Sequence, residues 1–148
     1  MTDFNATNTA YELRLKALAA ASAANRAAVF DALSATSITA VIVEFDGEGD
    51  SGQITDIAGF TGELSVQIPA ISIHLQQAAW NADELSTVAE SLRDAIETLC
   101  YDYLEHEHGG WENNDGGNGT FHFDIAKRSI RLEFNERFSD YINHSHEF

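Results

Sequence analysis

The stretch from Asp46 to Gln53, with the sequence DGEGDSGQ, places three carboxylates at alternate positions among glycines. These acids are Asp46, Glu48 and Asp50. Hard cations such as Ca²⁺ and Mg²⁺ take oxygen ligands, and a chain that curls lets several of them converge. The stretch departs from an EF-hand, because Ser51 stands where that loop needs glycine and Ile57 where it needs a bidentate glutamate. A plain turn, in which aspartates bond their own backbone, accounts for the same residues.

A second stretch, from Glu105 to Asp124, gathers histidines, acids and asparagines around a run of glycines. Its acids Glu112 and Asp115 offer further oxygen ligands for a hard cation. One hypothesis is therefore a divalent cation, the only cofactor the sequence indicates, which serves a metal-binding protein or a metal-dependent hydrolase. Its ligands would be Asp46, Asp50, Glu112 and Asp115.

The histidines of this stretch have a simpler interpretation. His106 and His108 are two residues apart at the end of an expected helix, so their side chains point in different directions. We expect them to complement the negative end of the helix dipole. The residues from Asn113 to Gly119 tolerate positive φ and predict a shaped loop, which Trp111 is large enough to anchor on the core.

Negative charge is concentrated in the middle of the chain. The 148 residues carry a formal net charge of −16. Between Ala27 and Ala126 stand eighteen acids and a single base, Arg93, while both flanks are close to neutral. Such a field repels phosphate, so direct nucleic-acid binding and binding to an anionic membrane are disfavoured. It attracts basic protein surfaces and cations, although acidity can also serve solubility alone.

Other catalytic machinery is not evident in the sequence. There is no GxSxG, Walker or Rossmann glycine motif, and Cys100 lies on the apolar face of an expected helix, where a buried thiol is expected. The single cysteine, the lack of a long apolar run and an N-terminus unlike a signal peptide predict a soluble cytoplasmic protein.

The periodicity of apolar residues predicts one domain of the α+β class over residues 1–148. We expect a mostly antiparallel sheet of about five or six strands with two helices on one face. A long first helix is expected over 8–34, and the sheet with a second helix over 37–138. The second helix is expected to begin near Asn81–Glu84 and to end at Gly109–Gly110, and a short frayed tail is expected to contain His144 and His146.

The strings VEFDGEGDSGQI and HGGWENNDGG resemble those of an uncharacterised family of small acidic bacterial proteins, often carried on plasmids and other mobile elements. The resemblance covers roughly residues 43–138. It implies no activity, but it directs attention to the two stretches that carry these strings.

The favoured hypothesis is a small acidic binding protein whose partner is a protein with a basic surface. In this hypothesis it is a mobile-element inhibitor of a host nucleic-acid-processing or defence complex. Its expected binding residues are Glu44, Glu48, Asp56, Trp111, Asn113 and Asn114.

Overall fold

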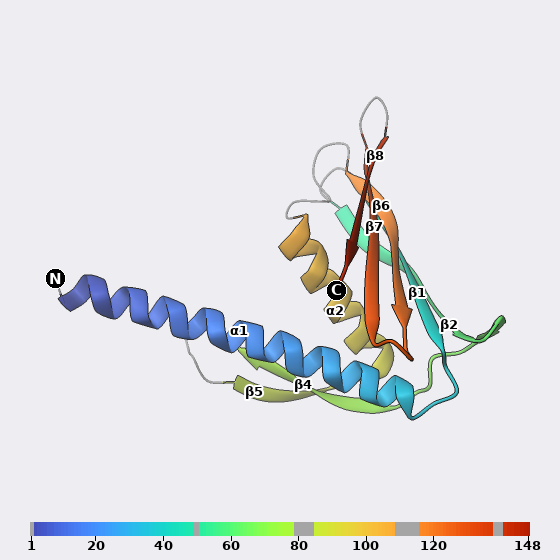
Figure 1. Ribbon diagram of the computed structural model, residues 1–148, viewed down its shortest axis with the longest axis horizontal. Coiled ribbons are helices and arrows are strands. Elements are labelled where there is room, and N and C mark those ends of the chain that lie inside the picture. The colour runs from blue at the N-terminus through green and yellow to red at the C-terminus, as the bar shows by residue number, and fades with distance from the viewer. Residues whose placement is uncertain (1, 49–50, 79–84, 109–115, 138–140) are drawn as a thin grey trace.

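Two helices and eight strands make up the described part of the chain (Figure 1). The computed structural model describes residues 2–48, 51–78, 85–108, 116–137 and 141–148. The elements are α1 (Thr2–Ser34), β1 (Ala40–Glu48), β2 (Ser51–Thr61), β3 (Leu64–Val66), β4 (Ser72–Ala78), β5 (Leu85–Ser91), α2 (Leu92–Glu107), β6 (Gly117–Asp124), β7 (Ser129–Arg137) and β8 (Tyr141–Glu147). Neither helix of this part is long and apolar enough to cross a membrane.

Six strands form one sheet in the order β3-β2-β1-β6-β7-β8, and every neighbouring pair is antiparallel. Strands β4 and β5 form a separate antiparallel pair. The expected α+β class is confirmed. The strands do not all belong to one sheet, because the chain leaves the six-stranded sheet after β3, passes Pro69 and begins the second pair at Ser72.

Alternation along the strands separates two faces of the six-stranded sheet. We call the face that carries the core the inner face. Four phenylalanines lie on it, and their rings meet across strands, with centroids 5.6 Å apart for Phe45 and Phe121 and 5.9 Å apart for Phe45 and Phe134. The fourth, Phe123, lies 5.9 Å from Phe30 of α1. Helix α2 adds the buried side chains Leu92, Ala95, Ile96, Leu99, Cys100 and Leu104.

Among the side chains of α1 that the structure describes, burial begins in the second half of the helix. The first of them to be buried is Ala21, whereas Leu15 and Leu18 are 46% and 42% exposed. Figure 1 shows the N-terminal half (dark blue) extending beyond the other elements. The second half lies against the β4–β5 pair, where the Asn25 side chain donates to the Gln76 carbonyl oxygen at 3.0 Å and accepts from the Gln76 N–H at 2.6 Å. The Asn25 side chain therefore pairs with the Gln76 backbone as a neighbouring strand would.

The second helix begins later than expected. Residues 85–91 form β5, in which Val88 pairs with Leu75, and residues 79–84, including the expected start at Asn81–Glu84, lie outside the described residues. The helix instead starts after Ser91, whose side chain accepts a hydrogen bond from the Asp94 N–H at 3.1 Å. A short segment that matches a helical spacing can also pair as a strand, and here the pairing with β4 decides.

The expected frayed tail is also wrong. Residues 141–147 form strand β8, which pairs with β7 from Arg131↔Glu147 to Arg137↔Tyr141. His144 and His146 therefore have fixed neighbours.

Part of the shaped loop expected over 113–119 belongs to β6. Gly116 has a positive φ of 75°, but Gly117 and Gly119 are strand residues. A Cβ on Gly119 would overlap the Glu133 carbonyl oxygen and approach the Phe45 ring within 2.9 Å. Glycine is needed there for close packing between strands, not for positive φ.

Candidate functional site

The second face of the six-stranded sheet, which we call the outer face, carries mostly polar side chains. None of its described side chains is fully buried. Alternation and register give its members with described side chains as Ser65 of β3; Gln53, Asp56, Ala58 and Phe60 of β2; Ala40, Ile42, Glu44 and Asp46 of β1; Asn118, Thr120, His122 and Asp124 of β6; Ser129, Arg131, Glu133 and Asn135 of β7; and Asn143, Ser145 and Glu147 of β8. The register also assigns Arg137 and Tyr141 to this face, but their side chains are not described.

A row of four amide side chains and one carboxylate crosses the outer face near one end of the sheet. The register aligns Gln53, Asp46, Asn118, Asn135 and Asn143 on five successive strands. Within it, the Asn135 amide donates to Asn118 Oδ1 at 3.1 Å, and the Asn143 amide donates to Asn135 Oδ1 at 2.7 Å. We call these three asparagines the amide ladder. They orient one another and so present a defined set of donors and acceptors.

A second row, of three acids and two hydroxyl side chains, lies beside the amide ladder. The register aligns Asp56, Glu44, Thr120, Glu133 and Ser145. Glu44 and Asp56 are exposed and stand directly opposite each other on β1 and β2. Like charges in this position destabilise a sheet. At the other end of the row, Glu133 accepts a hydrogen bond from the Ser145 hydroxyl at 3.0 Å.

Positive charge on the outer face is sparse. Among its described side chains, Arg131 is the one guanidinium, and its Nε lies 3.3 Å from Glu133 Oε1. Against it stand the acids Glu44, Asp46, Asp56, Asp124, Glu133 and Glu147. Burial, followed by the charge of Arg131, lowers the pKa of His122, and Glu133 opposes this shift. The net shift favours the neutral imidazole, so His122 adds little positive charge.

Several other bases have contacts away from this face. Arg128 Nη1 lies 2.9 Å from Asp31 Oδ1 of α1, and Arg26 donates to the carbonyl oxygens of Arg128 and Phe148. Arg93 donates to the Ile57 carbonyl oxygen at 3.3 Å. Arg128 and Arg26 thus have their contacts at α1 and at the end of β8, whereas Arg93 lines the same hollow as Asp56.

The predicted site residues divide into two groups. Glu44, Asp46 and Asp56 share the outer face. Glu48 ends strand β1, and its side chain is not described. The remaining predicted residues lie outside the described residues, namely Asp50, Trp111, Glu112, Asn113, Asn114 and Asp115.

The described flanks of the two acidic stretches are neighbours in the sheet. Gly47, shortly before Asp50, pairs with Gly117, shortly after Asp115, and Asp46 pairs with Asn118. Within residues 2–48, 51–78, 85–108, 116–137 and 141–148, no group of three or more His, Cys, Asp or Glu side chains is placed to hold a metal ion. The adjacency therefore concerns the backbone leading into the two stretches.

The only cysteine has no features of a nucleophile. Cys100 is buried in α2, and burial, followed by the nearby charge of Glu97, raises the pKa of its thiol. A thiol that resists ionisation reacts slowly. The expectation of a structural cysteine is confirmed.

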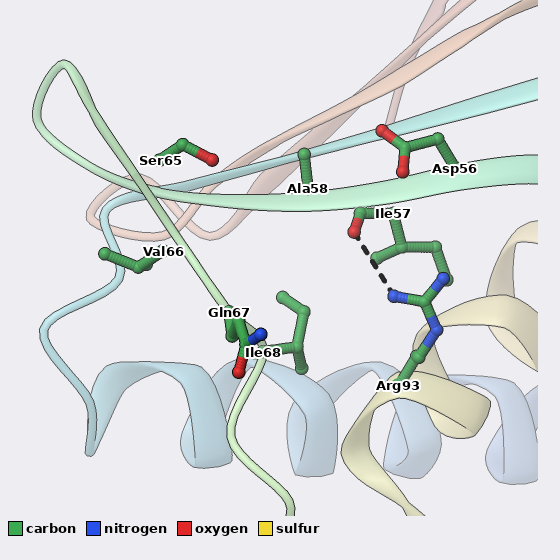
Figure 2. Close-up of a pocket in the computed structure, with 8 residues that line it drawn as sticks. All are labelled: Asp56, Ile57, Ala58, Ser65, Val66, Gln67, Ile68 and Arg93. Atoms are coloured by element: carbon green, nitrogen blue, oxygen red, sulfur yellow. Dashed lines mark hydrogen bonds between the residues drawn. The ribbon is translucent and has the colours of Figure 1, made fainter.

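A hollow of about 460 Å³ lies at the edge of β2 where β3 ends (Figure 2). Strand β3 pairs only with residues 59–61 of β2. Beyond that point side chains of α2 contact the strand edge: Arg93 donates to the Ile57 carbonyl oxygen, and the Tyr101 hydroxyl accepts the Ile54 N–H at 2.8 Å. Arg93 in this hollow and the neighbouring Tyr101 thus satisfy part of an unpaired sheet edge.

Sequence reasoning missed the amide ladder and the part of the outer face on β7 and β8. The alternation of Ile130, Leu132 and Phe134 with polar residues indicated which side chains of β7 face outward. It could not indicate that Asn135 would align with Asn118 and Asn143, because register depends on pairing between distant strands.

These elements define an α+β protein in which one face of an antiparallel sheet forms the core with two helices and the other carries acids and amides. The chain belongs to a family of unknown function, DUF6878, whose model matches residues 21–148. The match begins at Ala21, the first buried residue among the described side chains of α1, and extends beyond the residues 43–138 of the sequence resemblance. No curated protein and no solved structure matches the chain.

Proposed function

We propose that this protein binds a basic protein surface through the outer face of its six-stranded sheet. The observation that carries the proposal is the opposition of Glu44 and Asp56, two exposed carboxylates paired across β1 and β2. Their repulsion opposes folding, and a cationic partner would relieve it. The scarcity of bases among the described side chains of this face supports the same function.

The class of partner follows from the charge. A surface rich in carboxylates fits grooves that otherwise hold phosphates, so we propose as partner a host nucleic-acid-processing or defence complex, which this protein inhibits. The resemblance to proteins of mobile elements supports this role, and we propose the same genetic origin here. DNA should then compete with this protein for the partner.

The test is the single substitution Glu44→Lys. Binding to an arginine-rich peptide, used as a defined basic probe, is measured by calorimetry from about 50 to about 500 mM salt, a range over which the screening length falls roughly threefold. Wild-type affinity should fall steeply with salt, and Glu44→Lys should weaken binding about tenfold at low salt. The variant should also unfold at a slightly higher temperature, because the introduced ammonium group would face the Asp56 carboxylate.

The matched control is Glu63→Lys, which changes the net charge equally at the exposed turn between β2 and β3. Binding by this variant should stay within about twofold of wild type at the same salt concentration. Equal losses in the two variants would show that only net charge matters, and wild-type binding that ignores salt would refute the proposal.

A second candidate function is the binding of a divalent cation where the two acidic stretches adjoin, in a metal-binding protein or a metal-dependent hydrolase. The pairing of Gly47 with Gly117 favours it, because this pairing brings the backbone flanks of both stretches together. The expected result is a higher melting temperature with Mg²⁺, Mn²⁺, Ca²⁺ or Zn²⁺, reversed by chelator and reduced by Asp46→Asn. A melting temperature that no metal changes would exclude this candidate.

A further inference from the structure

Three histidines meet on the inner face where the end of α2 packs against β7 and β8. The Nε2 atoms of His108 and His146 are 2.9 Å apart, and the ring centroids of His108 and His144 are 5.3 Å apart. His108 also stacks on Phe134 of β7, with centroids 4.0 Å apart and ring planes 8° apart. We call these three residues the histidine cluster. It joins the last turn of a helix to the edge strand of the sheet.

Charged groups face the cluster from several elements. From α2, Glu107 Oε2 lies 3.7 Å from His146 Nδ1, while the exposed His106 lies 4.0 Å from the other oxygen of Glu107. From β7, Glu136 Oε1 lies 3.0 Å from His144 Nε2. From α1, Arg26 donates to the Phe148 carbonyl oxygen at 2.9 Å, two residues beyond His146. For His108, the two glutamates act to raise the pKa, whereas His146 and His144 act to lower it.

The short contact between His108 and His146 constrains their protons. Two ring nitrogens 2.9 Å apart are held by a hydrogen bond in which one donates and the other accepts. The accepting ring must be neutral. When both rings are protonated, both nitrogens are donors and the contact becomes repulsive.

We propose that the histidine cluster is a pH-sensitive latch that holds β8 against α2 at neutral pH and loosens it when the histidines become protonated. The latch goes beyond the proposed binding function and does not depend on it. Its geometry is the Nε2 contact and the stacked ring of His108, both of which connect a helix to a strand with only one neighbour in the sheet.

The direction of the pH dependence follows from the environment of His108. Burial, followed by the charges of His146 and His144, lowers the pKa of His108, and the glutamates only partly oppose this. A histidine whose pKa is lowered by folding stabilises the folded state fully above its ordinary pKa of about 6.5. That stabilisation is lost as the pH falls through this value towards the lowered pKa.

Loosening β8 would also alter the outer face. His144 and His146 alternate along this strand with Asn143 and Ser145, which donate to Asn135 and Glu133 of β7. A strand that moves away takes these two contacts with it. The latch would therefore couple protonation on one side of the sheet to the amide ladder on the other.

Hydrogen exchange measured by mass spectrometry at about pH 7.5 and about pH 5.5 brackets the ordinary histidine pKa and tests the latch. After correction for intrinsic exchange rates, protection of residues 141–147 should fall about tenfold at the lower pH, while the central strands β1 and β6 change little. His108→Gln keeps a neutral polar side chain and should remove most of this difference. His74→Gln, at an exposed histidine of β4, is the matched control and should leave it intact.

A second measurement does not need the variants. Nitrogen-detected NMR of the wild-type imidazoles at about pH 7.5 should show one protonated and one unprotonated Nε2 between His108 and His146, because the two rings share a hydrogen bond. Equal protection of β8 at both pH values, or protonated Nε2 atoms on both rings at about pH 7.5, would overturn the proposal. The same conclusion would follow if folded His108→Gln kept the wild-type pH dependence.

Discussion

The two faces of the six-stranded sheet are built from the same strands but have opposite chemistry. In β6, Phe121 and Phe123 point into the core, while Thr120 and His122 alternate with them and point outward. In β8, His144 and His146 face α2, while Asn143 and Ser145 join the polar rows. Adjacent residues therefore differ in their packing here: inner positions are buried in the core, and outer positions make polar contacts or remain exposed.

The largest expected effect is that of Phe121→Ala. This side chain is fully buried among Phe45 and Tyr103, and its removal leaves a cavity in the centre of the core. We expect a loss of about 4 kcal/mol in the free energy of unfolding, measured by urea denaturation. Thr120→Ala, one residue away on the outer face, should cost less than about 1 kcal/mol. Similar losses in the two variants would show that both faces of the sheet contribute equally to the free energy of unfolding.

The next effect is that of Gly119→Ala. An added Cβ would overlap the Glu133 carbonyl oxygen, so β6 and β7 must separate locally. We expect a loss of about 3 kcal/mol by the same measurement. Gly62→Ala, at the β2–β3 turn, is the comparison: nothing lies within 4 Å of its added Cβ, so any cost reflects the φ of 61° alone. A neutral Gly119→Ala would contradict the packing role of this glycine.

The smallest effect is expected for Asn135→Ala, which interrupts the amide ladder at its middle. The side chain donates to Asn118 and accepts from Asn143 at a partly exposed position. We expect the free energy of unfolding, measured by thermal denaturation, to fall by about 1 kcal/mol, because water can replace part of the two lost hydrogen bonds. Asn143→Ala removes one of the two contacts and should cost less. A loss as large as that of Phe121→Ala would mean that the outer face stabilises the fold as much as the core does.

The α+β class and most strands could be predicted because their signals are local. A β-branched run from Ile38 to Phe45 and alternation from Thr120 to Ile125 each correspond to one strand of the sheet. The acids Glu44 and Asp56 could be identified from composition. Their direct opposition could not, because it depends on a register that shifts at the bulge between Glu44 and Phe45.

The regions that could not be predicted are those where pairing overrides local preference. Leu85 to Ser91 fit a helical spacing, yet they pair with β4. Residues 141–147 lack a strong apolar alternation, because two of the three inner positions, after Ile142, are the histidines His144 and His146. The histidine cluster was hidden for the same reason: His108 and His146 are 38 positions apart, and only the docking of β8 brings them together.

The contacts of Arg26 have a practical consequence for attaching this protein to a surface. Its guanidinium donates to the backbone oxygens of Phe148 and Arg128, and the Phe148 ring stacks on Tyr103 with centroids 4.5 Å apart. A linker attached near Phe148 would disturb these contacts, whereas attachment at the start of α1 would act at the far tip of a projecting helix (Figure 1). Surface immobilisation through the tip of α1 should therefore leave the outer face of the sheet accessible and these contacts undisturbed.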